Sequence, residues 1–426
     1  MKTILLFGAG KSATVLIDFL RTEAGKRGWK FLIADANREQ ILLKTGESPE
    51  VDAIGCDIND AAARSTLVKR ADLVISMMPP ALHHLIAEDC IHFGKHLLTA
   101  SYVDSTIRAF DREVRDKNLL FLCEMGLDPG IDHMSAMRLL DHIRKNGQVL
   151  VSSFKSHCGG LVAPESDDNP WHYKISWNPR NVVLAGKAGA IFLEDGLEKR
   201  VPYEKLFADC EIVSIEGLGD LSAYANRDSL SYIPLYGLDG VSTFIRTTLR
   251  YPVFCSAWQA VAAAGLTDDQ IKLNTSGMTL RSWAAPILPY VNAGNKELFT
   301  FLGFYEDIPV PAKAQTSADV LQYLLENKLA MQEKDKDMIV MQHEIEFDDK
   351  LALSTLLVKG TDHLRTAMAK TVGLPLGIAA CLILENKIQL RGVQIPTSPE
   401  IYTPVLAELE KQGIIFLERI TIKEKK

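Results

Sequence analysis

The N-terminal stretch KTILLFGAGKSA, residues 2–13, decides the fold of this chain. An apolar run ends in the turn GAGKSA, and the apolar helical pattern TVLIDFLRTEAGKRG follows it. This is a G-x-G-x-x-A fingerprint between a strand and a helix, the context that dinucleotide binding requires. Gly8 permits the tight turn, Gly10 lets the backbone approach a pyrophosphate, and Ala13 allows the helix to pack closely. The helix N-terminus then offers amide donors to the phosphates.

Strand-like and helix-like segments alternate after this stretch. This alternation predicts an α/β fold with a Rossmann-type, doubly wound parallel sheet and right-handed crossovers. We expect this dinucleotide-binding domain to cover residues 1–128. Its further strands are predicted at residues 29–35 (WKFLIAD), 51–57 (VDAIGCD), 71–80 (ADLVISMMPP), 95–101 (KHLLTAS) and 119–126 (LLFLCEMG).

The second strand ends in Asp35, which bears on the choice between NAD and NADP. A carboxylate there accepts hydrogen bonds from the ribose hydroxyls of NAD. It would repel a 2′-phosphate, because two unit charges about 4 Å apart interact by about 4 kcal/mol at an effective dielectric near 20. Arg38 follows three residues later and could hold a 2′-phosphate. We weigh Asp35 more heavily and expect NAD to be preferred, with NADP possible.

The ends of the next strands mark the rest of the predicted ligand crevice. Cys56 and Asp57 end the third strand, where the adenine edge usually lies. Residues 76–79 close the fourth strand near the nicotinamide ribose, and Ser101 and Tyr102 end the fifth. Ligands of open α/β sheets bind beyond the carboxyl ends of the strands.

The stretch CEMGLDPGIDH, residues 123–133, lies where the first region passes into the second. Asp128 is a good helix N-cap, and Pro129 suits the first helical position after it. Residues 131–147 predict the helix, with apolar side chains three or four residues apart. Asp128 is therefore expected where a strand ends, a helix begins and two domains meet. The alternative is that it only caps the helix.

Length and composition limit the class of protein. The 426 residues suggest two or three domains, and a net charge of -7 argues against a duplex nucleic-acid binder. We expect no membrane span. The start of the chain fits a first strand better than a signal peptide, so we expect a cytoplasmic protein. Seven dispersed cysteines without a C-x-x-C pair indicate reduced thiols and no metal site.

The second region has a different texture. We expect residues 129–395 to form an α+β substrate-binding and dimerisation domain, and residues 396–426 to pack back on an earlier domain as a helix and a strand. The expected elements are a strand at 148–157, a long loop at 158–180, a strand at 243–252, a helical insert at about 257–333, a hairpin turning at Asp348-Asp349, and an apolar helix at 365–387 broken by Gly373 and Pro375.

Two arginines of this region, Arg227 and Arg250, are candidates for binding carboxylates. A guanidinium fork pairs bidentately with a carboxylate, and such a clamp suits an acidic substrate. The alternative is that each arginine makes a structural ion pair.

The chain resembles the saccharopine dehydrogenase family of the L-glutamate-forming type, also called saccharopine reductase. The combination of GLDPGIDH with CGGLVAPE, DNP and YKISW in this order is specific to that family. Departures from the family pattern stand at Pro80, Val162, Ala225 and Thr247. Matching segments are GAGKSA (8–13), ASYVDS (100–105), EMGLDPGIDHMSAM (124–137), SHCGGLVAPESDDNPWHYKISW (156–177), ANRDS (225–229), TTLRYP (247–252), KDMIVMQH (336–343), AMAKTVGLPLGIAA (367–380) and SPEIYTPVLAELEKQGI (398–414).

The resemblance implies a homodimeric oxidoreductase and a substrate, saccharopine, with three carboxylates and two amino nitrogens. It implies that saccharopine is oxidised to an imine, which water splits into glutamate and aminoadipate semialdehyde. The positions that it assigns to substrate are Ser101, Tyr102, Asp128, Arg227, Thr248, Leu249 and Arg250. The expected cofactor contacts are Gly8, Gly10, Lys11, Ser12, Ala13, Asp35, Cys56, Asp57, Ser76, Met77, Pro79, Leu127 and Trp177.

The secondary ammonium of saccharopine must lose a proton before hydride transfer, so a base is required. Asp128 and Tyr102 are the nearest candidates, Cys158 and His157 are further ones, and the sequence does not choose among them. Two other functions remain open. One is a related reductase such as carboxynorspermidine dehydrogenase, and the other is a non-catalytic NAD-binding sensor.

Overall fold

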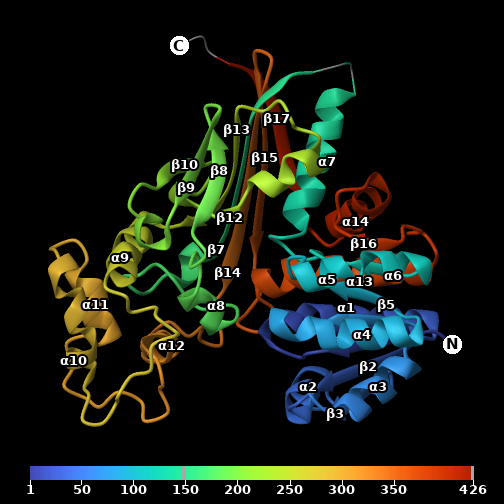
Figure 1. Ribbon diagram of the computed structural model, residues 1–426, viewed down its shortest axis with the longest axis horizontal. Helices are drawn as coiled ribbons and strands as arrows, with labels where there is room; N and C mark the ends of the chain where they lie inside the picture. Colours follow the sequence, from blue (N-terminus) through green and yellow to red (C-terminus); the bar gives the residue numbers. More distant parts are fainter. Residues whose placement is uncertain (146, 148, 424–426) are drawn as a thin grey trace. The chain divides into compact units, whose positions relative to one another are not determined.

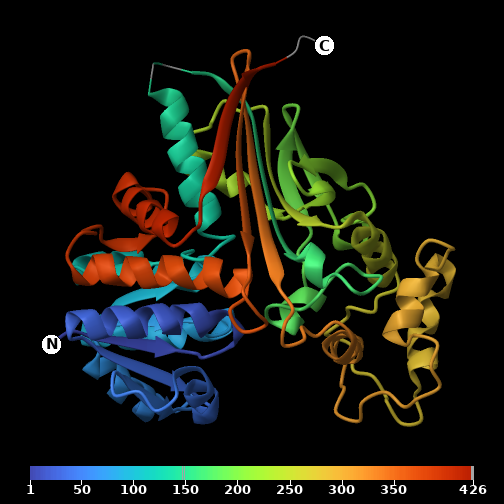
Figure 2. The same ribbon diagram turned by 180° about the vertical axis from the view of Figure 1, so that it is seen from behind.

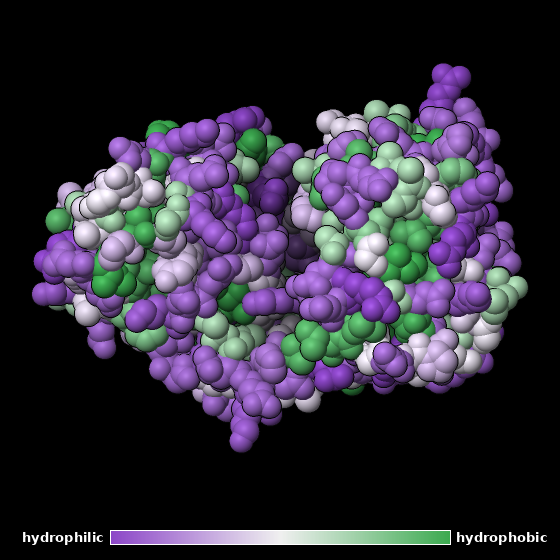
Figure 3. Space-filling model, turned by 90° about the horizontal axis from the view of Figure 1, so that it is seen from below, coloured by the Kyte–Doolittle hydropathy of each residue, from purple (hydrophilic) through white to green (hydrophobic). Residues whose placement is uncertain are grey.

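The computed structural model describes residues 1–145, 147 and 149–423 and divides the chain into two compact units. Unit 1 comprises Met1–Gly147 and Leu364–Ile415, and unit 2 comprises Gln148–His363 and Phe416–Lys426. The elements of both units can be followed in Figure 1. The face shown in Figure 3 is mostly hydrophilic, with hydrophobic residues gathered in separate patches.

Unit 1 contains a seven-stranded sheet in the order β16-β6-β5-β4-β1-β2-β3, and every strand pair in it is parallel. The strand order runs outward in two directions from β1 and β4, so the predicted doubly wound sheet is confirmed. β16 joins the edge beside β6, a strand that the sequence analysis did not expect. The strands are β1 (Thr3–Phe7), β2 (Lys30–Asp35), β3 (Val51–Gly55), β4 (Leu73–Ser76), β5 (His96–Thr99), β6 (Leu120–Leu122) and β16 (Gly392–Gln394).

Helices cover both faces of this sheet. Apolar residues of α3, α4, α5 and α6 share one core cluster with the strands. Helices α1 and α13 pack against each other, and Figure 2 shows them side by side. The helices of unit 1 are α1 (Thr14–Arg27), α2 (Arg38–Thr45), α3 (Ala61–Arg70), α4 (His83–Phe93), α5 (Ser105–Ala109), α6 (Asp111–Asp116), α7 (Ile131–Arg144), α13 (Ala367–Leu384) and α14 (Pro399–Lys411), with 3-10 turns η1 (Lys11–Ala13) and η2 (Pro80–Leu82).

Helix α13 is continuous, so the predicted break at Gly373 and Pro375 is wrong. Gly373 lies against α1, where a Cβ would come within 2.8 Å of the Leu16 nitrogen. The glycine therefore serves close packing of two helices rather than a turn. α13 is also long and apolar enough to cross a membrane, but 83% of its apolar window is buried inside the protein. That burial identifies it as a core helix.

The start of α7 differs from the predicted cap. The helix begins at Ile131 after Gly130, whose φ of 146° suits glycine, and the bond between Asp128 and Pro129 is cis. Gly130 packs so tightly on Gly126 that a Cβ would lie 2.2 Å from the Gly126 oxygen. Asp132 accepts the Gly130 N–H at 2.6 Å. Asp128 is thus not the N-cap of α7.

Unit 2 is built on a ten-stranded mixed sheet with the main order β10-β11-β13-β7-β14-β15-β17, to which β8, β9 and β12 attach. The predicted hairpin turning at Asp348-Asp349 is confirmed by the β14–β15 pairing. Its strands are β7 (Val151–Val162), β8 (Ala190–Glu194), β9 (Leu197–Val201), β10 (Glu211–Ile215), β11 (Gly219–Ala225), β12 (Arg227–Asp228), β13 (Thr243–Arg250), β14 (Asp337–Phe347), β15 (Lys350–Lys359) and β17 (Phe416–Ile422).

Strand β7 is longer than expected. The sequence analysis began a loop at Cys158, but the strand continues to Val162 because Cys158–Val162 pairs with Asp337–Met341 of β14. The predicted helical insert is present and buries an aromatic core around Trp171, Phe254 and Trp258. The helices are α8 (Pro179–Val183), α9 (Pro252–Ala263), α10 (Leu280–Ala284), α11 (Lys296–Leu302) and α12 (Ser317–Lys328), with 3-10 turns η3 (Pro164–Ser166), η4 (Tyr203–Lys205), η5 (Leu230–Tyr232), η6 (Pro234–Tyr236) and η7 (Ala285–Tyr290).

The compact units follow different bounds from the expected domains 1–128, 129–395 and 396–426. α7 packs on α14, and α13 packs on α1, so both helices belong with the dinucleotide fold. Within the C-terminal segment, α14 lies in unit 1, whereas β17 pairs with β15 in unit 2.

Candidate active site

The fingerprint loop lies where the strand order reverses, between β1 and β4. Gly8 has a φ of 97°, and a Cβ there would come within 3.0 Å of the Met77 oxygen after β4. Nothing lies within 4 Å of the Cβ position of Gly10, so its backbone is open to a ligand. Ala13 is buried, and the turn Lys11–Ala13 leads directly into α1. The loop therefore offers a pyrophosphate the approach that the fingerprint predicts.

Two charged side chains hold this loop. Asp35 accepts the Ala9 N–H at 2.8 Å and the Asn37 N–H at 2.9 Å. The ammonium of Lys44 in α2 donates a hydrogen bond to the Gly10 oxygen. Burial lowers the pKa of Lys44 to about 8, and the nearby charges of Asp35 and Asp18 offset this only in part. Arg38 donates Nε to the Ala53 oxygen at 3.0 Å. Lys44 was not singled out from the sequence, because the contact depends on how α2 packs.

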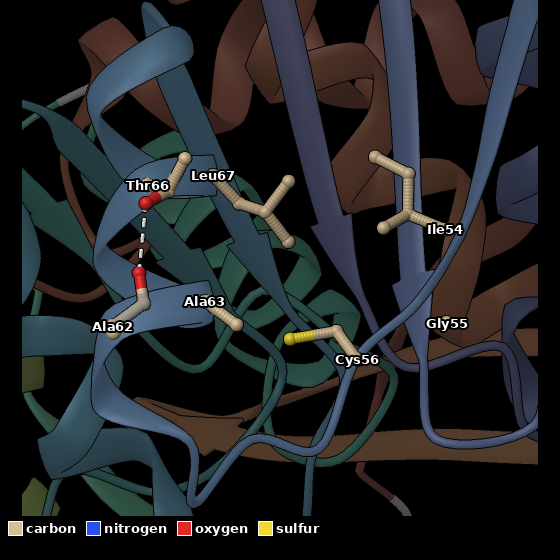
Figure 4. A pocket seen from close by; sticks show the side chains of 7 residues that line it. All are labelled: Ile54, Gly55, Cys56, Ala62, Ala63, Thr66 and Leu67. Atoms are coloured by element: carbon tan, nitrogen blue, oxygen red, sulfur yellow. Dashed lines mark hydrogen bonds between the residues drawn. The ribbon is translucent and has the colours of Figure 1, made fainter.

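A pocket of about 390 Å³ lies between the end of β3 and α3 (Figure 4). Cys56 and Leu67 point into it from opposite sides, and burial raises the pKa of the Cys56 thiol. An apolar slot at this strand end suits the flat face of an adenine. Asp57 does not line the pocket; its carboxylate accepts the Asn59 N–H at 2.9 Å. The lining residues are Ile54, Gly55, Cys56, Ala62, Ala63, Thr66 and Leu67.

The ends of β4 and β5 carry a cluster of hydroxyl groups around a buried histidine. The Met77 N–H donates to the Phe7 oxygen at 2.8 Å, so the chain beyond Ser76 continues along β1 toward the fingerprint loop. The Ser76 hydroxyl lies 2.7 Å from Nδ1 of His83, and the Ser101 hydroxyl lies 2.8 Å from Nε2. The sequence predicted Ser76 at the cofactor and Ser101 at the substrate, and it carried no signal for His83.

Glu124 clamps the segment that follows β5. Its N–H donates to the Ser101 oxygen at 3.1 Å, and its Oε1 accepts the Val103 N–H at 3.0 Å. His133 of α7 lies 2.9 Å from Oε2 of the same carboxylate. Glu124 and His133 are both buried, so the His133 ring holds the Glu124 carboxylate in place. The residue between the two clamped groups is Tyr102.

The clamp delivers Tyr102 to Asp128. The Tyr102 hydroxyl donates to Oδ1 of Asp128 at 2.9 Å, and both side chains are half-buried rather than enclosed. Leu127, beside them, is buried. A carboxylate that accepts a hydrogen bond from a phenol hydroxyl at a strand-to-helix junction can hold an ammonium or take its proton. Unit 1 therefore brings together Ser76, Ser101, Tyr102 and Asp128 from three separate segments.

In unit 2 the register of β13 against β7 shows which of the predicted site residues lie on the same face of the sheet. Thr248 pairs with Cys158, and Thr247 pairs with His157. Side chains alternate along a strand, so Thr248, Arg250 and Cys158 share one face, and His157 belongs to the other. His157 lies 2.7 Å from the Thr247 hydroxyl, and burial lowers its pKa to about 3. It is therefore not a base for a ligand on the Arg250 face.

Leu249 also points to that other face and packs in an apolar cluster. Only its backbone can serve a ligand beside Arg250, and its carbonyl oxygen already accepts Nη1 of Arg250 at 2.8 Å. The substrate assignment of Leu249 thus concerns its main chain.

Arg250 is 5% exposed and lies in an aromatic cage. Its guanidinium carbon is 5.3 Å from the ring centroid of Tyr173 and 5.7 Å from that of Phe254. Nε of Arg250 has no hydrogen-bond partner, and no carboxylate forms an ion pair with it among the residues that the structure describes. A buried guanidinium of this kind is the strongest anion-binding feature of unit 2.

The other assigned residues of unit 2 have different surroundings. Arg227 is exposed in β12, with a φ of 54°. Trp177 donates Nε1 to the Tyr173 hydroxyl at 3.3 Å, which links it to the cage around Arg250. Arg246, which the sequence analysis did not assign, is 2% exposed, lies 4.5 Å from the Tyr232 ring centroid and shares the face of Arg250. Within the described ranges, no cluster of three or more His, Cys, Asp or Glu side chains could hold a metal ion.

The fold and the fingerprint loop define a dinucleotide-binding oxidoreductase class. Residues 4–122 match the family described as "Saccharopine dehydrogenase NADP binding domain", and residues 126–414 match "Saccharopine dehydrogenase C-terminal domain". The chain belongs to the saccharopine dehydrogenase family.

Individual relatives agree with that assignment. Saccharopine dehydrogenase [NADP(+), L-glutamate-forming] of Saccharomyces cerevisiae is 30% identical, with 99% of each chain covered. Alpha-aminoadipic semialdehyde synthase of Arabidopsis thaliana is 32% identical over 98% of this chain, which spans 44% of that relative's length. This chain thus corresponds to about half of the plant synthase. The solved structure of apo yeast saccharopine dehydrogenase (L-Glu forming) matches with a TM-score of 0.87 at 29% identity, over 99% of this chain and 100% of that one.

Proposed function

We propose that the chain is a saccharopine dehydrogenase of the L-glutamate-forming type. The reaction converts saccharopine, water and an oxidised nicotinamide dinucleotide into glutamate, 2-aminoadipate 6-semialdehyde, the reduced dinucleotide and a proton, or runs in reverse. The yeast relative carries this activity in its name and spans nearly the same length as this chain, and the plant relative is named for the semialdehyde. We also propose that the reaction takes place in the cytoplasm.

Arg250 carries the proposal. A buried cation without an ionic partner is costly, and the cost is offset when an anion occupies the site. Nε of Arg250 has no hydrogen-bond partner within the chain, and a guanidinium fork matches the geometry of a carboxylate. A substrate with carboxylates along its length meets this requirement.

Arg227 is proposed to bind a second carboxylate of the substrate, at a distance from the one that Arg250 binds. The N–H of its neighbour Asn226 donates to the Arg246 oxygen at 2.8 Å. Arg246 is four residues from Arg250 on β13, roughly 13 Å along the strand. The main chain beside Arg227 thus lies roughly 13 Å from that of Arg250, and two arginines on backbone so far apart suit a long ligand with separate carboxylates better than a short one with a single acid group.

Tyr102 and Asp128 are proposed to handle the amine. The Tyr102 hydroxyl donates to Asp128, which favours the ionised carboxylate as the proton acceptor. Asp128 then binds the secondary ammonium of saccharopine and takes its proton. A nicotinamide dinucleotide held at the fingerprint loop would supply the hydride acceptor for the adjacent carbon. Cys158, on the Arg250 face, remains a further polar contact, and water hydrolyses the resulting imine.

We propose a preference for NAD over NADP, although the yeast relative is named for NADP(+). Asp35 lies at the end of β2 and is tied to Ala9 of the fingerprint loop, where its charge opposes a 2′-phosphate. Arg38 is turned to the Ala53 oxygen, and Lys44 to the Gly10 oxygen. Lys44 is a cation close to the loop. Its charge would attract the 2′-phosphate of NADP and offset part of the repulsion by Asp35, so NADP would still bind, but more weakly than NAD.

We further propose that the protein is a homodimer. Among the residues that the structure describes, β17 pairs with β15 on one side only, and Leu417 and Ile422 on it are 75% and 72% exposed. An edge strand with exposed apolar side chains offers a self-complementary pairing surface. Light scattering coupled to size exclusion should give twice the chain mass, and Leu417→Lys should shift it toward the monomer. A monomeric wild type at micromolar concentration contradicts the dimer.

The test of the activity is reduction of NAD and NADP by purified protein with saccharopine, lysine or carboxynorspermidine. We expect turnover with saccharopine alone, and glutamate as a product. Turnover with carboxynorspermidine instead would assign a related reductase. Binding of NADH without turnover of any amine would assign a sensor.

A further inference from the structure

A buried histidine joins the cofactor side of unit 1 to the substrate side. His83 is the first residue of α4 and is 3% exposed. Nδ1 faces the hydroxyl of Ser76 at 2.7 Å, and Nε2 faces the hydroxyls of Ser101 at 2.8 Å and Thr99 at 3.2 Å. A ring enclosed in this way, with both nitrogens engaged, is more than a side chain that fills space.

The ring is neutral. Burial lowers the pKa of His83 to about 4, and Asp104 offsets this only in part. A neutral imidazole has one N–H donor and one acceptor nitrogen. Ser76 and Ser101 must therefore take opposite roles: one hydroxyl donates its proton to the ring, and the other accepts a proton from it.

The proposed contact between Ser101 and a substrate carboxylate selects one of the two arrangements. Its N–H donates to the Thr99 hydroxyl oxygen at 3.2 Å, which ties the backbone of Ser101 to the same cluster. A ligand carboxylate only accepts, so the Ser101 proton is needed for it. Nε2–H of His83 then donates to Ser101, and the Ser76 hydroxyl donates to Nδ1.

We propose that His83 is a positioning residue that turns the Ser101 hydroxyl toward a substrate carboxylate and ties this orientation to Ser76 on the cofactor side. The proposal rests on the proposed function, because that function assigns Ser101 to the substrate. It gives His83 a role in substrate affinity and none in proton transfer.

A matched pair of variants separates the two bonds. The amide of asparagine reaches about as far as Nδ1, and that of glutamine about as far as Nε2. His83→Asn keeps a partner for Ser76 and loses the one for Ser101, whereas His83→Gln does the opposite. We expect His83→Asn to lower kcat/KM for saccharopine roughly tenfold or more through KM, with an unchanged Kd for NADH. His83→Gln should retain most of the wild-type KM.

A double-mutant cycle with Ser101→Ala tests the coupling. The loss caused by His83→Asn should largely disappear in the Ser101→Ala background, because the hydroxyl that it positions is gone. The proposal would be overturned if His83→Asn lowered kcat/KM equally in both backgrounds. It would also be overturned if the two His83 variants lost kcat/KM equally and in parallel with their melting temperatures. Either result would leave His83 a structural residue.

A second measurement does not depend on the reaction. Nitrogen NMR of protein labelled at histidine should show His83 as the neutral Nε2–H tautomer at pH 6. The Nδ1–H tautomer or a charged ring contradicts the proposal even when the variants fold poorly. If the wild type does not oxidise saccharopine, the proposed function fails, and the tautomer alone decides on His83.

Discussion

Arg250 lies over the ring of Tyr173, with its guanidinium carbon 5.3 Å from the ring centroid, and both side chains are buried. The ring face attracts the cation but does not neutralise it, since cation–π attraction contributes only about 0.5–2 kcal/mol. The Trp177 indole donates to the Tyr173 hydroxyl and fixes the ring in turn. The arrangement holds a positive charge in place for an anion that comes from outside the chain.

Replacement of Arg250 should separate function from stability. Arg250→Met removes the charge and keeps most of the volume, so a substrate carboxylate loses its partner. We expect kcat/KM for saccharopine to fall roughly thirty- to several-thousandfold, which corresponds to a loss of about 2–5 kcal/mol in transition-state binding free energy. The melting temperature should stay the same or rise, because the free protein no longer buries a charge without an ionic partner.

Steady-state kinetics and thermal unfolding of the same samples check this prediction. Arg200→Met is a matched control, since Arg200 pairs with Glu198 on an exposed strand. A drop in melting temperature with near-normal kinetics would show that Arg250 serves the fold and would remove the main support for the substrate.

Asp128 and Tyr102 should respond differently to isosteric changes. Asp128→Asn keeps the shape but cannot hold or deprotonate an ammonium, so we expect a loss of about 10²–10⁴-fold in kcat. Tyr102→Phe removes one donor to the carboxylate and should cost less. It should also move the acid limb of the kcat/KM profile to higher pH, because a hydrogen bond to the charged form lowers a carboxyl pKa.

The measurement is kcat and kcat/KM of both variants from about pH 4 to 9, a range that reaches the titration of a carboxyl group, with the melting temperature as a control. Normal activity of Asp128→Asn at unchanged stability would leave Asp128 without a catalytic role. Cys158→Ser is then the next variant to test, because Cys158 lies on the Arg250 face.

The sequence predicted the elements better than their contacts. Apolar runs that end in turn residues indicated the strands of the dinucleotide fold, and β1 with its fingerprint loop is where it was expected. The cap at Asp128 was wrong because Gly130 and Asp132 form the helix start instead. Its site role rested on a family resemblance rather than on local pattern.

Contacts that depend on register or on neighbouring strands could not be predicted. His157 and Cys158 are neighbours on β7 and therefore face opposite sides of the sheet, but only the pairing with β13 shows which of them shares the face of Arg250. His83 looked like an ordinary helix residue, because its partners come from the ends of β4 and β5. Gly373 carried the signal of a break but belongs to a close helix contact.

Cofactor choice should follow two charges near the fingerprint loop. We expect NAD to exceed NADP at least tenfold in kcat/KM, because Asp35 opposes the 2′-phosphate. Asp35→Ala should narrow the ratio, and Lys44→Gln should lower the use of NADP more than that of NAD. Dissociation constants of NADH and NADPH from nucleotide fluorescence give the same comparison without turnover. Equal or better use of NADP by the wild type would contradict the preference.

Acid should destabilise the protein through two buried histidines. The pKa of His83 is lowered to about 4 and that of His157 to about 3, in both cases chiefly by burial. In the unfolded chain each titrates near 6.5. Between these values the unfolded state binds more protons, so the free energy of unfolding falls as the pH drops below about 6.5. Each histidine contributes about 1.4 kcal/mol per pH unit in that window and nothing above it.

Denaturant unfolding at pH 7.5, 6.0 and 5.0 measures the effect. His83→Gln should show a smaller loss between pH 7.5 and 5.0 than the wild type, by up to about 2 kcal/mol, because one proton uptake is removed. His172→Gln is the control: His172 is exposed and pairs with Asp167, so its removal should leave the slope at least as steep. An identical slope for the wild type and His83→Gln would show that His83 titrates in the folded protein near its ordinary pKa. That result would contradict the lowered pKa that its enclosure by Ser76, Thr99 and Ser101 explains.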